Sequence, residues 1–308
     1  MKIVYALIFV ALLVLGGIVY VLQKDSTSDY QAEPETDTTD VVVDESVTEE
    51  EPEPEPEPAE RGPESVIGQS ANGNDITAYH FGSGDEEILF VGGTHGGYSF
   101  NTALVAFELV DYLTANPDVV PEGYTATVIP VLNPDGLNET IGTTGRFDGA
   151  AVTANDEARV DGRFNGNGVD INRNFDCQWE AEATWQNRDV SGGSAPFSEP
   201  EALAIRQYVD DNDIAGAVVW YSQAGGVYAS QCDGPTLPAT TELTDVFADA
   251  AGYPAFAEFD FYEITGDMVN WFAKERIPAI SVLLTDHENA EWSKNRAGVN
   301  AVLEYFAE

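Results

Sequence analysis

Positively charged residues and histidine are scarce in this chain of 308 residues. Lysine and arginine number 13 in total against 54 aspartates and glutamates, which gives a formal net charge of −41 at pH 7. Proteins bind nucleic acid largely through clustered Lys and Arg side chains that neutralise phosphates. We therefore expect no nucleic-acid partner. The only imidazoles from which a metal centre could be built are those of His80, His95 and His287.

Charge of either sign is absent from residues 3–22, IVYALIFVALLVLGGIVYVL. An apolar helix of about 20 residues spans the roughly 30 Å hydrocarbon core of a bilayer, whereas a cleaved signal peptide has an apolar stretch of only about 7–15 residues. Lys2 precedes this stretch, and strongly acidic sequence follows Lys24. The positive-inside rule then places the N-terminus in the cytoplasm. We expect residues 1–24 to be a retained single-pass anchor in the cell membrane, with the rest of the chain extracytoplasmic.

Basic residues are also absent from residues 25–60, which contain fifteen acidic residues and the repeat EPEPEPEP. Such a segment repels itself and cannot bury enough apolar surface to offset the entropy lost on ordering. Proline at every second position favours an extended polyproline conformation. We expect residues 25–64 to be a disordered acidic linker that holds the following domain away from the membrane.

Residues 65–308 have the composition of a globular domain, and their number suffices for one large domain with a substantial core. Short apolar runs rich in β-branched residues predict strands at 76–81, 88–91, 126–132, 217–221 and 280–284. Amphipathic patterns predict helices at 102–113, 199–211, 242–251, 267–275 and 295–306. Ser198 and Glu201 predict a capping box at the start of the second helix. This alternation favours a single α/β domain whose twisted sheet carries helices on both faces.

Four motifs follow one another along this domain: NPDG at 133–136, GRFNGNGVDINRNF at 162–175, SGGSAPFSEPEA at 191–202 and FYEITGDMVNW at 261–271. Together they resemble the zinc carboxypeptidases of the carboxypeptidase A-like family, over nearly the whole domain. The resemblance implies a mixed, mostly parallel sheet. It also implies the removal of a C-terminal residue, or cleavage of a related bond in cell-wall peptides. In that chemistry a zinc ion held by two histidines and a glutamate activates water, and a second glutamate is the general base.

Several residues of the chain match positions with a role in that family. His95 falls at the first zinc ligand, and Asn172 with Arg173 falls at the pair that grips the substrate carboxylate. Arg163 matches the arginine that stabilises the oxyanion, and Tyr262 matches the substrate-side tyrosine. These roles suit the side chains, because guanidinium and carboxylate groups pair through two parallel hydrogen bonds and a developing oxyanion needs a fixed cation.

The remaining catalytic positions depart from the family pattern. Tyr98 and Ser99 stand where the ligand glutamate belongs, and Tyr221 stands at the second histidine. Leu283 occupies the position of the general base. Loss of a general base alone slows such reactions by about 10²- to 10⁴-fold. We therefore expect neither a cofactor nor catalysis, and instead a pocket that binds the C-terminal carboxylate of a peptide or cell-wall peptide.

Other interpretations of these residues stay open. His95, His287 and a carboxylate would form a rebuilt metal site, in which case the protein is an active zinc carboxypeptidase of an atypical kind. His95 is otherwise a core histidine, and Arg173 is otherwise the centre of a structural ion-pair network. A third possibility is a structural or partner-docking module with a vestigial pocket.

The two cysteines, Cys177 and Cys232, follow motifs whose strand ends the resemblance places side by side. In an outward-facing domain they are expected to form a disulfide. A reactive thiol is the alternative, although neither cysteine has a histidine in its local sequence.

Overall fold

The computed structural model describes residues 62–152, 155, 157 and 159–308. The predicted anchor at 1–24 and nearly all of the predicted linker at 25–64 lie outside these residues. Within the described part of the chain, no helix is long and apolar enough to cross a bilayer.

Eight strands form the main sheet, and two more form a separate hairpin. The main-sheet strands are β1 (Glu64–Gln69), β2 (Asp75–Gly82), β3 (Glu86–Val91), β4 (Tyr124–Ile129), β7 (Asp213–Ser222), β8 (Gly226–Ala229), β9 (Ala255–Phe256) and β10 (Ala279–Leu284). The hairpin consists of β5 (Glu182–Trp185) and β6 (Arg188–Ser191). The α-helices are α2 (Phe100–Ala115), α3 (Pro134–Ile141), α4 (Pro200–Asp211), α5 (Pro238–Ala251), α6 (Met268–Lys274) and α7 (Trp292–Ala307).

The sheet is mixed, with a parallel centre. Its strand order is β1-β2-β4-β3-β7-β10-β8-β9. The four central strands β4, β3, β7 and β10 run parallel, whereas β1, β2 and β8 each join by antiparallel pairing. Parallel strands are normally covered on both faces, and the buried residues of these four are accordingly mostly apolar. The buried polar exceptions are Glu87, Thr125, Thr127 and Ser281. The expected mixed, mostly parallel sheet is confirmed.

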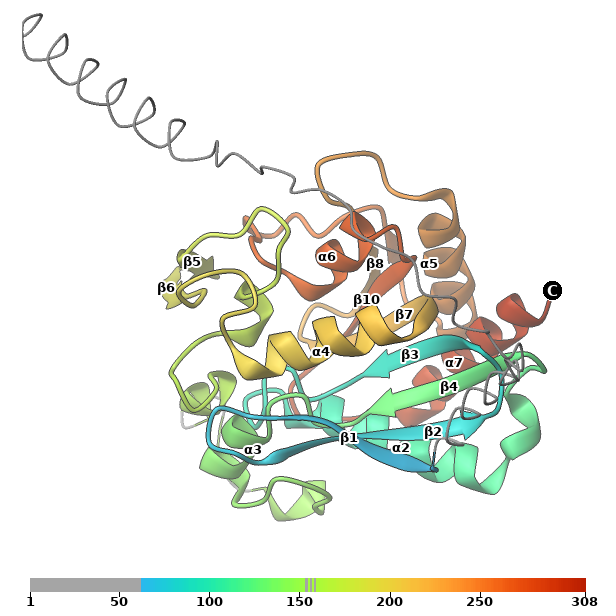
Figure 1. The fold of residues 1–308 in the computed structure, drawn as a ribbon, viewed down its shortest axis with the longest axis horizontal. Coiled ribbons are helices and arrows are strands. Elements are labelled where there is room, and N and C mark those ends of the chain that lie inside the picture. The colour runs from blue at the N-terminus through green and yellow to red at the C-terminus, as the bar shows by residue number, and fades with distance from the viewer. Residues whose placement is uncertain (1–61, 153–154, 156, 158) are drawn as a thin grey trace, which may run out of the picture. The chain divides into compact units, whose positions relative to one another are not determined.

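Side chains of the central strands alternate between two cores. Leu89 and Val91 of β3 face one core, and Ile88 and Phe90 face the other. The helices α4 and α6 cover the first face, and α2, α5 and α7 cover the second. Figure 1 shows α4 in front of the sheet and α2 and α7 behind it. The prediction of helices on both faces is therefore confirmed.

The predicted elements match observed ones, with ends displaced by up to four residues. The capping box predicted at α4 is wrong, because the helix begins one residue later and Glu199 is its N-cap. The Ser198 hydroxyl donates instead to the Glu199 carboxylate. The strands β1, β5, β6, β8 and β9 and the helix α3 were not predicted, since they are short or carry polar residues that break the apolar pattern.

A disulfide joins Cys177 and Cys232, whose Cα atoms lie 6.0 Å apart. The bond connects the segment that follows Arg173 to the segment that follows β8. The predicted disulfide is thus confirmed, and the reactive-thiol alternative is not.

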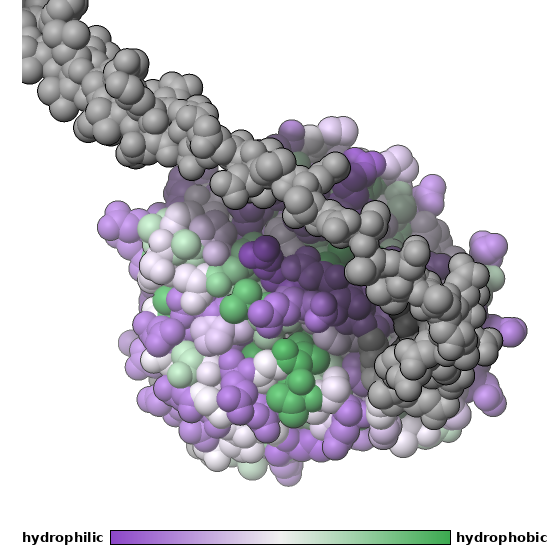
Figure 2. Space-filling model, in the orientation of Figure 1, coloured by the Kyte–Doolittle hydropathy of each residue, from purple (hydrophilic) through white to green (hydrophobic). Residues whose placement is uncertain are grey.

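On the face drawn in Figure 2, hydrophilic residues predominate and hydrophobic ones form small separate areas.

Candidate ligand-binding site

Three parallel strands end at the same edge of the sheet, and each delivers one residue of the candidate site. His95 lies just beyond β3, Tyr221 lies near the end of β7, and Leu283 lies near the end of β10. The parallel register pairs Tyr221 directly with Leu283. All three line a cavity of about 1300 Å³. The carboxyl ends of parallel strands are where α/β folds usually bind ligands.

His95 is buried, with 5% of its surface exposed. Its Nε2 atom lies 3.7 Å from Asp170 Oδ1, and among the described residues neither ring nitrogen has a hydrogen-bond partner. Burial lowers the pKa of His95 well below its usual value, and the nearby Arg163 lowers it further. The imidazole is therefore neutral at pH 7, with two polar atoms facing a site that does not satisfy them.

Arg163 is held by a carboxylate. Its Nη2 and Nε atoms donate to Asp170 Oδ2 at 2.7 and 2.9 Å, and both side chains are buried. Burial alone would raise the pKa of Asp170, but the charges of Arg163 and Arg173 outweigh it and hold that pKa below its usual value. The guanidinium also lies 4.3 Å from the centroid of the Trp185 ring. The arginine expected at the oxyanion position is thus already neutralised by an internal partner.

Arg173 is equally buried, with 1% of its surface exposed, but its partners are uncharged. Nε and Nη2 each donate to the Thr184 carbonyl at 3.1 Å, and Nη1 donates to the Asn172 carbonyl at 2.6 Å. A guanidinium has five N–H groups, so one on each terminal nitrogen remains uncommitted. Arg173 forms no ion pair with any residue of the described chain, and it lines the cavity. Its charge still interacts with the buried carboxylates of Asp170 and Asp267, whose ionised forms it favours.

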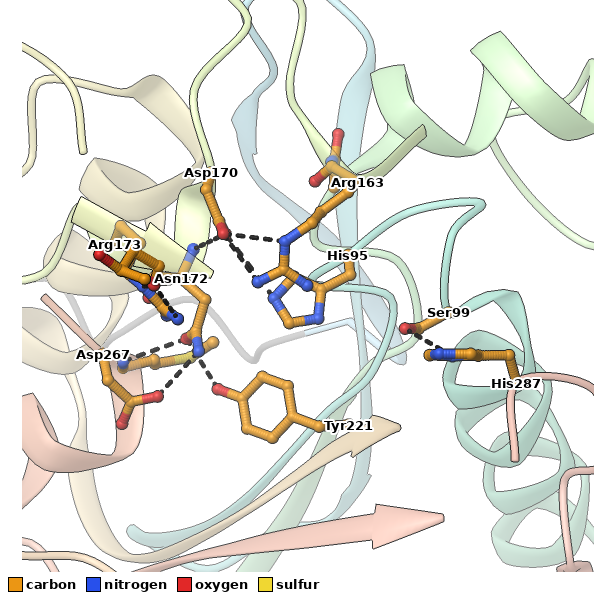
Figure 3. A network of polar contacts seen from close by, with 12 residues as sticks. His95, Ser99, Arg163, Asp170, Asn172, Arg173, Tyr221, Asp267 and His287 are labelled. Carbon is orange, nitrogen blue, oxygen red and sulfur yellow. Dashed lines mark hydrogen bonds and ion pairs between the residues drawn. The ribbon is translucent and has the colours of Figure 1, made fainter. Parts of the chain in front are cut away.

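Asn172 is oriented by a chain of hydrogen bonds, which Figure 3 shows together with the two arginines. Its Oδ1 atom accepts from the Tyr221 hydroxyl at 2.9 Å and from the Met268 N–H at 3.2 Å. Its Nδ2 atom donates to Asp267 Oδ2 at 2.8 Å. One N–H of the amide remains uncommitted. Tyr221, at the position of the second zinc ligand, therefore positions the amide beside Arg173.

Aromatic packing engages Tyr98, one of the two residues that stand where the ligand glutamate belongs. The Tyr98 ring lies 5.0 Å from that of Trp185 and 4.5 Å from that of His287, measured between centroids. Tyr262 is half-buried, lines the cavity and packs against this cluster. Ser99 is buried, and its hydroxyl lies 3.4 Å from Nδ1 of His287. The structure thus brings His95, Arg163, Asn172, Arg173 and Tyr262 to one cavity.

The residues present do not fit a catalytic zinc. Over the described ranges, there is no group of three or more His, Cys, Asp or Glu side chains that could hold a metal ion. Zinc needs at least three such ligands in a catalytic site. Of the expected ligand positions only His95 keeps a ligand side chain, while Tyr98 and Tyr221 are engaged in ring packing and in the Asn172 hydrogen bond. The rebuilt site of His95, His287 and a carboxylate gains no support from this geometry.

Comparison with known families agrees with the motifs and the geometry. A family model described as zinc carboxypeptidase matches residues 63–291. The chain belongs to the zinc carboxypeptidase family. The resemblance given by the four motifs is therefore confirmed, and the changed zinc and general-base positions make the chain a divergent member.

Two curated relatives are each 25% identical to the chain. One is gamma-D-glutamyl-L-diamino acid endopeptidase 1 of Lysinibacillus sphaericus, aligned over 244 residues that make up 72% of this chain and 60% of the relative. The other is a metallocarboxypeptidase A-like protein of Trichophyton verrucosum, aligned over 234 residues, 68% of this chain and 53% of the relative. The chain therefore matches little more than half the length of these relatives.

Solved structures share the fold at low identity. Murein-tripeptide amidase from Escherichia coli O157 superposes with a TM-score of 0.57 at 20% identity, covering 81% of this chain and 94% of the amidase. Carboxypeptidase A from Helicoverpa armigera gives a TM-score of 0.59 at 17% identity, with coverage of 79% and 68%. These similarities establish the carboxypeptidase-like fold of the domain.

Three residues of the site were missed in the sequence. Asp170 stands two residues before Asn172 in DINRNF, and an acid so close to two predicted site residues was a usable signal. Asp267 precedes a helical pattern, as an N-cap does, and its carboxylate accepts the Asn270 N–H. Trp185 gave no signal, because it lies in a hairpin that the apolar pattern does not reveal.

We predict that Arg163→Met lowers the free energy of unfolding by about 3–5 kcal/mol at pH 7, because it removes the ion-pair partner of the buried Asp170 carboxylate. Without the arginine, the folded-state pKa of Asp170 rises above its unfolded value. The penalty is therefore largest near neutral pH and shrinks as the pH falls through the raised pKa of Asp170 in the variant. Urea denaturation of both proteins at several pH values measures this.

Arg188→Met is the matched control, since this exposed arginine lies 5.3 Å from the same Trp185 ring but outside the buried pair. It should change stability by less than about 1 kcal/mol. Equal effects of the two substitutions would refute a structural role for the pair of Arg163 and Asp170.

Proposed function

We propose that this protein is a non-catalytic receptor for the C-terminal carboxylate of a peptide, built on the carboxypeptidase fold. The observation that supports the proposal is the environment of Arg173, a buried guanidinium that lines the cavity without an ion-pair partner from the described chain.

A buried charge is costly unless an opposite charge accompanies it. The chain contains 54 acidic residues, yet the described part places none in an ion pair with Arg173. The uncommitted N–H groups of Arg173 and the remaining N–H of Asn172 are donors suited to a carboxylate. Asp170 and Asp267 interact with the charge of Arg173 without pairing with it directly. A ligand carboxylate entering the cavity would supply a direct ion-pair partner.

The same site supports binding without hydrolysis. Leu283 cannot accept a proton, and Tyr98 and Tyr221 stand in place of zinc ligands. Arg163, which an active site would direct at a developing oxyanion, is instead bound to Asp170. Each of these changes removes a group that the hydrolytic chemistry requires, while the carboxylate donors remain.

The names of the relatives support a cell-wall peptide as the ligand. One is a gamma-D-glutamyl-L-diamino acid endopeptidase and another is a murein-tripeptide amidase. We further propose the arrangement expected from the sequence, with an N-terminal membrane anchor at 1–24, an acidic linker at 25–64 and the ligand-binding domain at 65–308 outside the cytoplasm. This arrangement would present the pocket to peptides beyond the membrane.

The anchor is tested by deletion. The full chain should sediment with the membrane fraction and resist extraction with high salt, because about 20 apolar residues hold it in the bilayer. A chain that begins at residue 25 should be found in the soluble fraction. If the full chain is released by salt alone, it is not an integral membrane protein.

Zinc content separates the proposal from its main rival. We expect the purified full chain, loaded with zinc and then dialysed to remove unbound metal, to retain well under one equivalent of zinc by elemental spectrometry. The reason is that a single imidazole is a weak zinc site. One tightly held equivalent, together with chelator-sensitive release of C-terminal residues, would establish an atypical metallocarboxypeptidase instead.

Peptide binding tests the carboxylate directly. In calorimetry, a peptide with a free C-terminal carboxylate should bind about 10- to 100-fold more tightly than its C-terminal amide, because hydrogen bonds to charged groups are lost with the carboxylate. Arg173→Met should abolish this difference, and Arg206→Met, at an exposed arginine on α4, should preserve it.

The comparison of acid with amide on the unmodified protein remains informative if the Arg173 variant is unstable. Equal binding of the two peptides would refute the proposal. A docking module with a vestigial pocket would give a different result. Neither peptide would bind, and substitution of Arg173 would leave every partner interaction unchanged.

A further inference from the structure

One wall of the cavity is formed by the segment 258–263, EFDFYE, which joins β9 to the start of α6. All six of its side chains line the cavity. The segment consists of three acidic and three aromatic residues. Of these six, only Tyr262 belongs to the carboxylate site described above. The other residues therefore contribute features that carboxylate binding does not use.

Besides the buried Asp267, which interacts with Arg173, four acids line the cavity. Asp233, Glu258, Asp260 and Glu263 are exposed and line the cavity. Asp233 accepts from the Gln178 amide and Glu258 accepts from the Gln231 amide. Within the described part of the chain, none of the four forms an ion pair with Lys or Arg. These carboxylates face the cavity with their charge uncompensated.

The aromatic rings of this wall form a connected set with Tyr228. The Tyr228 ring stacks on Phe256 at 4.7 Å and lies 5.5 Å from Phe259, and Phe259 lies 5.1 Å from both Phe261 and Tyr262. Phe261 is 62% exposed. The face of an aromatic ring attracts a cation within about 6 Å of its centroid. Rings and carboxylates thus offer two kinds of cation recognition on one wall.

Tyr228 is an independent sign that the cavity accepts a polar ligand. Its side chain is 98% buried, its hydroxyl has no hydrogen-bond partner among the described residues, and it lines the cavity. The antiparallel register pairs Tyr228 with Ser281, so both side chains project from the same face of the sheet as Leu283. The hydroxyl therefore lies on the cavity side with its hydrogen-bonding capacity unused.

Positive charge in the cavity is confined to Arg163 and Arg173, since no other Lys or Arg of the described chain lines it. Arg163 contacts the Trp185 ring, and Trp185 belongs to the cluster against which Tyr262 packs. The acidic wall therefore begins next to the guanidinium groups. One end of the cavity favours an anion and the adjoining wall favours a cation.

We infer that the ligand is a peptide whose terminal carboxylate is accompanied by a side-chain ammonium group, as in a C-terminal basic or diamino acid residue. This inference rests on the proposed carboxylate-binding function and specifies its ligand. Arg173 binds the carboxylate, while Asp260, Glu263 and the neighbouring rings bind the ammonium group. A wholly anionic C-terminal residue is disfavoured by the same wall.

The test compares two tripeptides with free carboxylates that differ only at the last residue, lysine or norleucine, each with its C-terminal amide. Calorimetry on the full chain in detergent at low salt should show the lysine acid binding about fivefold more tightly than the norleucine acid. At about 1 M salt the preference should largely disappear, because screening at that ionic strength acts within roughly 3 Å.

The variant Asp260→Asn/Glu263→Gln should remove the lysine preference and leave the acid-over-amide preference intact. Glu304→Gln, at an exposed acid on α7 that does not line the cavity, should change neither preference. Equal binding of the lysine and norleucine acids, with both still preferred over their amides, would overturn the ammonium site alone. Loss of the acid-over-amide preference for both peptides would overturn the carboxylate proposal, and the ammonium site with it.

Discussion

The site depends on one buried guanidinium that forms no direct ion pair with the described chain, although Asp170 and Asp267 lie close enough to interact with its charge. Arg173 is fixed by two backbone carbonyls, which satisfy some of its N–H groups but none of its charge. Such an arrangement keeps the arginine in place at the floor of the cavity and leaves its charge available. Its orientation follows from the 3₁₀ turn at Ile171–Arg173 and from the hairpin that presents the Thr184 carbonyl.

The two arginines of the site differ in their partners, and our proposal of binding without catalysis rests on this difference. Arg163 is closed off by Asp170, whereas Arg173 forms no direct ion pair with a carboxylate of the described residues. The same carboxylate lies near His95, whose imidazole is left neutral and without hydrogen bonds from the described chain. His95, which aligns with the first zinc ligand of the family, is thus a buried residue of the pocket wall, while Arg173 remains available to an anion in our proposal.

The strand ends gather the residues that align with the family's catalytic positions, although the side chains there differ from the family pattern. Tyr221 and Leu283 remain register partners, and Tyr221 now donates the hydrogen bond that orients Asn172. Tyr98 and Trp185 fill space near His287 by ring packing. A sheet edge fixed by parallel pairing can thus retain a cavity while the side chains in it exchange metal binding for packing and hydrogen bonding.

The sequence by itself determined the α/β class, the family, the disulfide partners and the changed zinc and base positions. These follow from local periodicity and from motif order, which do not depend on distant contacts. Only the tertiary structure decided that Asp170 neutralises Arg163 and not Arg173, that Asp267 and Tyr221 position Asn172, and that the segment 258–263 forms a cavity wall. Each of these depends on which side chains meet in the folded chain. The spacing of residues along a sequence does not specify the directions in which their side chains point.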